Sequence, residues 1–214
     1  MAKEVMRKAP AFASLAQNYG VNVANVVEAI RQPIYDTVTY AAAGQTNLTF
    51  FALPIGQGGK TKVDTNMTTA GSLPAPQNFL CTAIHLMFKP NASLTPASQV
   101  ASLEGASIVE DTYVFGTNGL LEVQVGSKVQ LQDGPLGLFP PATLMEVNLS
   151  TTVAANAQGY GQWKGMVYDL TPILIPWGQN FSVTLNWNAA VALPSTLAGT
   201  VQCRMDGYLY RLAQ

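Results

Sequence analysis

The stretch from Phe181 to Trp187 constrains the fold of this chain most, because its side chains alternate strictly between apolar and polar types. A period of two over seven residues predicts a β-strand that buries one face and exposes the other. The predicted buried set is Phe181, Val183, Leu185 and Trp187, and the predicted outward set is Ser182, Thr184 and Asn186.

A second alternating run follows near the end of the chain, from Val201 to Leu212. Its apolar phase holds through Met205 and changes at Gly207, which predicts a β-bulge or a bend at that glycine. The intervening loop is too short for a crossover helix, so if the two strands pair, they pair antiparallel. A chain that ends in this way is predicted to be an all-β sandwich or barrel.

Charged side chains make up only 11% of the 214 residues, although hydrophobic residues make up an ordinary 48%. Typical soluble domains carry roughly 25% charged residues. A free monomer normally stays soluble through a charged surface, whereas buried interfaces are depleted in Lys, Glu and Asp. The composition therefore favours a surface that is largely covered by other subunits. The alternative is a low-charge extracellular or phage protein without a role in assembly.

The remaining compositional features exclude several functional classes. A formal net charge of −1 gives nucleic acid no strong electrostatic footprint. No apolar run approaches the ~18 residues of a transmembrane helix, and the first residues lack the apolar core of a signal peptide. Cys81 and Cys203 both lie in apolar strand patterns, which predicts buried free thiols and leaves a disulfide open.

The N-terminal segment, residues 1–33, is predicted to be an arm with one or two short amphipathic helices that end at Pro33. Its start is slightly basic, with Lys3, Arg7 and Lys8 against a single Glu4. Apolar residues then recur at spacings of three and four: Phe12, Leu15, Tyr19, Val23, Val26, Val27 and Ile30. Because this stripe has no cationic polar face opposite it, we expect it to pack on protein, either its own domain or a neighbour, rather than on a membrane.

Residues 34–214 are predicted to form a single β-sandwich domain of about nine or ten strands. Residues 78–89 are almost continuously apolar, as expected of a central strand that is covered on both faces. Residues 107–115 and 120–125 are expected to form a hairpin through the GTNG turn. The Gly-, Thr- and Pro-rich residues 56–77 are expected to be a surface loop. The further expected strands are 34–41, 47–55, 129–132, 144–149, 163–170, 173–175, 181–188 and 200–212.

The sequence presents no active site, cofactor site or metal site, so we expect a protein that is not an enzyme. His85 is the single histidine and is interpreted as a satisfied core or interface residue. Glu110 and Asp111 are adjacent, so on a strand they would point to opposite faces. A glycosidase needs two converging carboxylates; Glu122, Glu146, Asp169 and Asp206 could supply them only from separate strands.

Two motifs carry a resemblance to a known family. The sequence IPWGQNF at 175–181 leads into the alternating strand, and GYLYR at 207–211 closes the chain. Together with a helical N-terminal arm and long Gly/Thr/Pro loops, this pattern resembles the single jelly-roll major capsid proteins of icosahedral tailless bacteriophages. The resemblance spans roughly residues 34–213.

The resemblance implies two four-stranded antiparallel sheets and a structural virion protein that self-assembles into an icosahedral shell around a genome. It implies copies of the same chain and penton or minor capsid proteins as partners, and no cofactor. The N-terminal arm would face the interior or tether a neighbouring subunit. Lys3, Arg7 and Lys8 would then meet the genome or an internal membrane. Phe12, Leu15, Tyr19, Val26 and Ile30 are the candidate subunit contacts.

Two other functional classes stay open on the residues alone. A receptor- or carbohydrate-binding sandwich, such as a spike or lectin-like module, would use Trp163, Trp177 and Trp187 as sugar platforms. The alternation places Trp187 on the buried face, which weakens that interpretation. A cupin-type enzyme would need a cluster of histidines, which one histidine cannot supply.

Overall fold

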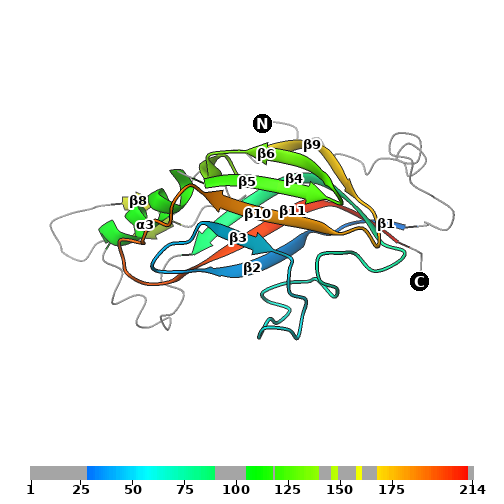
Figure 1. The fold of residues 1–214 in the computed structure, drawn as a ribbon, viewed down its shortest axis with the longest axis horizontal. Helices are drawn as coiled ribbons and strands as arrows, with labels where there is room; N and C mark the ends of the chain where they lie inside the picture. Colours follow the sequence, from blue (N-terminus) through cyan, green and yellow to red (C-terminus); the bar gives the residue numbers. More distant parts are fainter. Residues whose placement is uncertain are drawn as a thin grey trace.

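A computed structural model describes residues 28–89, 105–117, 119–139, 146–148, 158–160 and 168–211. Two antiparallel sheets pack face to face and enclose the core between them (Figure 1). The all-β sandwich expected from the alternating patterns is therefore confirmed.

The first sheet has five strands and is centred on the long C-terminal strand. Along one side of this strand, β11, runs β4, followed by β9; along the other side run β1 and β2, one after the other. The strands are β1 (Glu28–Arg31), β2 (Ile34–Tyr40), β4 (Asn78–Lys89), β9 (Tyr168–Ile175) and β11 (Gly199–Arg211).

The second sheet has four strands in the order β3-β10-β5-β6. Its strands are β3 (Asn47–Phe50), β5 (Gly119–Val125), β6 (Lys128–Asp133) and β10 (Phe181–Trp187). Outside the two sheets lie the helix α3 (Gly105–Thr117), the 3-10 turn η1 (Leu136–Leu138) and the small pair β7 (Glu146–Asn148) and β8 (Gln158–Tyr160).

The eight principal strands pair in a nested order. The first, β2, pairs with the last, β11; β3 pairs with β10, β4 with β9, and β5 with β6. The chain thus runs as one long antiparallel ribbon that folds across both sheets. Its innermost hairpin, β5–β6, turns at Gly126, whose φ of 59° suits the first central position of a two-residue hairpin.

The predicted wall of the core is confirmed in β10. Its four apolar side chains are buried and its three polar side chains are half-buried on the outer face. The sequence also predicts the bounds of β4 and its burial on both faces, since nine of its twelve residues from Asn78 to Phe88 are buried. Apolar side chains of the two sheets therefore meet in one contiguous core.

The two C-terminal strands do not pair with each other. β10 lies in the four-stranded sheet between β3 and β5, whereas β11 lies in the five-stranded sheet. The sequence left open whether these two strands pair, and the structure shows that they do not. The alternation fixes which face of a strand is buried, but a strand of one sheet presents the same pattern as a strand of the facing sheet.

The irregularity predicted at Gly207 is present as a shift in the pairing of β11 with β4. However, the face of β11 that is buried does not change at Gly207. Asp206 pairs with Ala83 and Gly207 pairs with Cys81, so β4 carries one extra residue, Thr82. The inner face of β11 continues through Leu209 into the core. Tyr208 and Tyr210 lie on the outer face with Leu80. A Cβ on Gly207 would lie 2.0 Å from the backbone oxygen of Leu80, so this close approach of strands requires glycine.

The strand expected at 107–115 is a helix, and its hairpin with 120–125 is wrong. Helix α3 covers one end of the sandwich (Figure 1). There Phe115 stacks on Phe88 of β4 with ring centroids 4.8 Å apart. Tyr40 and Trp187 join the same cluster. A short apolar run is compatible with either a helix or a strand, and the packing of Phe115 on the sandwich stabilises the helix.

Three further expectations differ from the strands of the structure. The second N-terminal helix was expected to include Ile30, but Ile30 lies in strand β1 opposite Leu209. The strand expected over 47–55 ends at Phe50, because Phe51 has a φ of 64° and leaves the sheet. The expected strands 163–170 and 173–175 correspond, in their described part, to the single strand β9.

Candidate functional site

The most specific arrangement among the described residues is the long loop between β3 and β4. Residues 51–77 leave the sandwich next to β2 and project beyond its edge (Figure 1). Long loops without regular secondary structure are uncommon in compact domains and are often functional. This loop is held to β2 by side-chain contacts along its length.

A buried carboxylate anchors the start of the loop. Asp36 of β2 is fully buried and forms an ion pair with Lys60, whose side chain is 10% exposed. The carboxylate also accepts the backbone N–H groups of Phe51 (2.6 Å) and Thr37 (3.0 Å). The Lys60 ammonium donates a further bond to the Thr37 carbonyl at 2.8 Å. Because a buried charge is costly unless paired, this contact fixes the loop against the sheet.

Further bonds hold the outer part of the loop. Asn66 accepts the Tyr35 N–H at 3.0 Å and donates to the Pro33 carbonyl at 2.8 Å. The Tyr35 hydroxyl donates to the carbonyl of Lys62. The Asp64 carboxylate accepts the N–H and hydroxyl of Thr61, and these bonds lower the pKa of Asp64. The loop is therefore held in one conformation by its own hydrogen bonds.

The expectation of a surface loop over residues 56–77 did not include the ion pair between Lys60 and Asp36. A signal was present in the sequence, because Asp36 shares the apolar face of its strand with Val38 and Tyr40. A carboxylate on a buried face requires a cation or hydrogen-bond donors from elsewhere in the chain.

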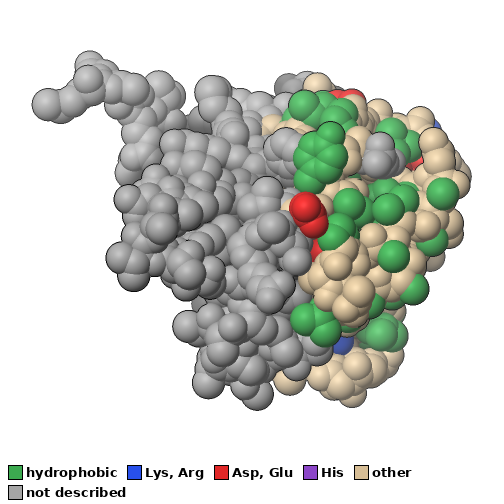
Figure 2. All heavy atoms as spheres, turned by 90° about the vertical axis from the view of Figure 1, so that its left-hand side faces the viewer, with side chains coloured by type: hydrophobic (Ala, Val, Ile, Leu, Met, Phe, Trp, Pro, Cys, Tyr) green, Lys and Arg blue, Asp and Glu red, His purple; other side chains and the backbone are tan. Residues whose placement is uncertain are grey.

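The outer face of the four-stranded sheet is a polar surface with few charges. Its side chains form cross-strand hydrogen bonds, from Asn47 to Asn186 (2.7 Å) and from Gln132 to Glu122 (3.2 Å). Glu122 is its single charge. We call this surface the polar face; it consists of Asn47, Thr49, Leu120, Glu122, Gln124, Val129, Gln132, Ser182, Thr184 and Asn186. At the end of the molecule shown in Figure 2, charged side chains are likewise sparse among the described atoms.

The five-stranded sheet carries a polar cluster on its own outer face. His85 Nε2 lies 3.0 Å from Asp206 Oδ2, and Arg204 Nε donates to Asp206 Oδ1 at 2.8 Å. Burial alone would raise the pKa of Asp206, but the bonds from His85 and Arg204 outweigh it and lower that pKa to about 2. His85 is 3% exposed and hydrogen-bonded, so its interpretation as a satisfied histidine is confirmed.

Among the described carboxylate side chains, Glu122 and Asp206 do not converge, and the side chains of Glu146 and Asp169 lie outside the described part. Glu122 and Asp206 lie on the outer faces of opposite sheets, which stand about 10 Å apart. Asp111 is buried in α3 and accepts the Ser195 N–H at 2.9 Å, whereas its neighbour Glu110 is exposed. Across the described ranges no three His, Cys, Asp or Glu side chains gather as metal ligands.

The two cysteines are free and buried. Along β11, Cys203 lies four residues from Gly207, the residue opposite Cys81, so the Cα atoms of the two cysteines are separated by about 13 Å. A disulfide joins Cα atoms that are at most about 7 Å apart. Burial raises the pKa of both thiols, which therefore stay protonated and unreactive.

The tryptophans differ in environment. Trp187 is buried in the aromatic cluster beneath α3, and Trp163 lies outside the described residues. Trp177 is 52% exposed on the turn between β9 and β10, where its backbone N–H donates to the side-chain oxygen of Asn78. Nearby, a cavity of about 180 Å³ lies between the end of β11 and the loop and is lined by Ile34, Met67, Leu73, Gln77 and Arg211 among others. It is smaller than the roughly 300–1,000 Å³ of typical ligand sites.

The candidate contact residues of the N-terminal segment are mostly not placed. Lys3, Arg7, Lys8, Phe12, Leu15, Tyr19 and Val26 lie outside the described residues. Ile30 is half-buried in β1. Among the helices that the structure describes, none is long and apolar enough to cross a membrane.

No family model, curated protein or solved structure matched this chain.

Proposed function

We propose that the protein is a structural virion protein, a capsid shell subunit that self-assembles into an icosahedral particle enclosing a genome. The sandwich would be a single jelly roll. The nested strand pairing supports this proposal, because a jelly roll arises when one long antiparallel ribbon wraps into two four-stranded sheets. On this assignment β1 extends the edge formed by β2.

The observation that carries the proposed function is the low number of charged side chains on the surface, where an isolated protein needs charge to stay soluble. Only one of ten outward side chains on the polar face is charged, and charged residues make up 11% of the whole chain. Burying uncharged polar side chains against a similar surface costs little free energy, because they can form hydrogen bonds with each other. Burying unpaired charges costs much more. Weak contacts of this kind become strong when repeated around a closed shell.

The proposed partners are copies of this chain together with penton or minor capsid proteins. Residues 1–33 would act as an arm, with Phe12, Leu15, Tyr19, Val26 and Ile30 in subunit contacts. The cations Lys3, Arg7 and Lys8 would meet the genome or an internal membrane. Three cations make a weak electrostatic contact compared with the six to ten phosphate contacts of a committed DNA-binding protein.

The size of the purified full-length protein tests the proposal. Sedimentation and electron microscopy should show megadalton particles, and a protein that stays a 22.8 kDa monomer at all concentrations would refute it. A variant lacking residues 1–27 keeps β1 and its pairing with β11, so it should fold but fail to form particles. Particles like those of the wild type from this variant would refute the role of the arm.

A receptor- or carbohydrate-binding module is the second candidate, and the exposure of Trp177 favours it. Exposed aromatic rings offer amphipathic platforms to sugars. This function predicts a monomer or small oligomer whose binding on a glycan array is abolished by Trp177→Ala. Loss of glycan binding in that variant, with its folding unchanged, would favour this candidate over the shell subunit.

A further inference from the structure

We propose that the projecting loop, residues 51–77, docks on the polar face of a neighbouring copy of this chain, with Lys62 meeting Glu122. This inference rests on the proposed self-assembly and names the two surfaces that would make one of its contacts. It commits to a second copy as the partner.

The first argument is the preorganisation of the loop. Ordering a long loop at an interface is costly, so a loop that is already fixed binds with less loss of entropy. Here the Asp36–Lys60 ion pair, the two bonds of Asn66 and the bond between Tyr35 and the Lys62 carbonyl fix the loop before any partner arrives. Internal turns add further backbone bonds, from Gly56 to Lys60 (2.9 Å) and from Thr65 to Thr61 (3.1 Å).

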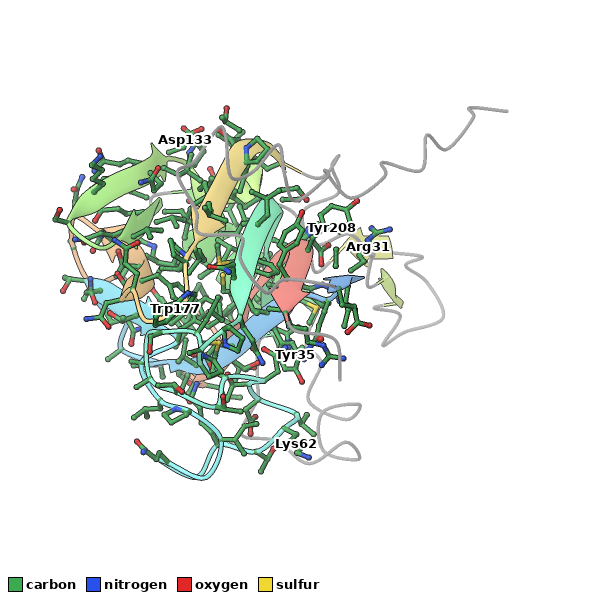
Figure 3. All side chains as sticks on the ribbon, turned by 90° about the vertical axis from the view of Figure 1, so that its right-hand side faces the viewer. Arg31, Tyr35, Lys62, Asp133, Trp177 and Tyr208 are labelled. Carbon is green, nitrogen blue, oxygen red and sulfur yellow. The ribbon has the colours of Figure 1, made fainter. Side chains whose placement is uncertain are left out.

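The second argument is what the loop presents at its outer end. Val63 is 82% exposed, more than any other large hydrophobic residue in the described part of the chain. Its neighbour Lys62 is exposed on the projecting part of the loop, below Tyr35 in Figure 3. Lys60 is already paired with Asp36, and Asp64 is held by Thr61, so Lys62 is the charge that the loop can offer to a partner.

The third argument is the complementary charge of the polar face. Glu122 lies in the middle row of that face, between Thr184 of β10 and Gln132 of β6. Its described partner is the neutral amide of Gln132, so the carboxylate is not neutralised by a cation there. A lysine from a second copy would supply that cation, and Val129, which is 52% exposed on the same face, offers apolar surface to Val63.

The size and geometry of the contact fit an assembly rather than an isolated dimer. Four strands of four to seven residues cover about 400 Å², half of the roughly 800 Å² that each partner of a stable pair buries. The loop leaves from the edge of β2 and β3, whereas the polar face is the broad side of its sheet (Figure 1). The contact therefore joins two different patches, and such a heterologous contact builds closed rings or shells when its rotation closes.

Charge reversal in the full-length chain tests the inference. Lys62→Glu and Glu122→Lys should each raise the critical concentration for assembly by more than about tenfold, because each places like charges in contact. The double variant Lys62→Glu/Glu122→Lys restores opposite charges and should assemble near the wild-type concentration. Sedimentation velocity measures the assembled fraction, and circular dichroism verifies that each variant is folded.

Matched controls separate the contact from general effects. Glu110→Lys reverses an exposed charge on helix α3 and should leave assembly unchanged. Val63→Asp should weaken assembly, whereas Val191→Asp, at a residue that is 41% exposed between β10 and β11, should not.

Two results would overturn the inference while leaving the proposed function intact. In the first, both single reversals and Val63→Asp assemble like the wild type. In the second, the double reversal remains as defective as the single ones. If the wild-type chain never assembles, the proposed function and this inference both fail.

Discussion

Replacing Lys60 by methionine should destabilise the subunit far more than the loss of a surface charge would. The substitution keeps most of the volume of the side chain but removes the cation from a carboxylate, Asp36, that is fully buried. The Lys60 side chain is only 10% exposed, so bulk water has little access to the position of the ammonium group. The carboxylate would then be buried with only part of its hydrogen bonds.

The magnitude follows from what remains around Asp36. Removing one partner of a buried ion pair costs about 3–5 kcal/mol. The N–H groups of Phe51 and Thr37 still bond the carboxylate, so we expect a value near the lower end, about 3 kcal/mol. For a domain of this size, each kcal/mol lowers the melting temperature by about 2–4 °C, which gives a decrease of about 6–12 °C.

Urea denaturation of the unassembled subunit, followed by circular dichroism, measures this change. The matched control is Lys62→Met, two residues along the same loop, which removes an exposed ammonium group and should change the unfolding free energy by less than about 0.5 kcal/mol. Equal effects of the two substitutions would refute the reasoning, because they would show that Lys60 is screened by solvent like a surface lysine.

Three further perturbations test the packing and the polar cluster. Gly207→Ala should destabilise the fold by about 3 kcal/mol or more in denaturant titration, because the new Cβ meets the backbone oxygen of Leu80 and not a movable side chain; a neutral effect would contradict the close approach. Asp206 has a pKa of about 2, below its unfolded value, so its stabilisation is present above about pH 4 and is lost as the pH falls through 2. The difference in unfolding free energy between wild type and Asp206→Asn should therefore shrink by about 2 kcal/mol between pH 5 and pH 2; a constant difference would count against the cluster. Cys81 and Cys203 should resist a thiol reagent in the native protein. They should react in about 6 M guanidinium chloride, about twice a typical unfolding midpoint. Rapid labelling of the native protein would show instead that the thiols are accessible.

The strands that could be read from the sequence are those whose burial pattern is local. The alternation of Phe181–Trp187 and the apolar run of Asn78–Lys89 each follow from side chains within one segment, and both strands match the structure. The outward side chains of β10 were predicted in the same way, and with them part of the polar face. The exposed residues of a strand can be predicted from its sequence because a strand exposes one face whichever strand it pairs with.

Helix α3 was missed because its segment is rich in residues that favour strands. Residues such as Val109 and Tyr113 have high β propensity. The helix is selected by its place at the end of the sandwich, where the Phe115 ring stacks on Phe88 from β4. That contact joins residues far apart in the chain, and tertiary packing routinely overrides weak local propensity.

The tertiary structure alone decided the partners of each element. Phe181–Trp187 pairs with strands that begin at Gly119 and Asn47, not with the strand that follows it. The buried Asp36 finds its cation 24 residues later, in a loop whose sequence reads as solvent-exposed. A local pattern determines which face of a segment avoids water, because burial depends on side-chain type and backbone period. Which surface covers that face depends on long-range packing and charge pairing, which no single segment encodes.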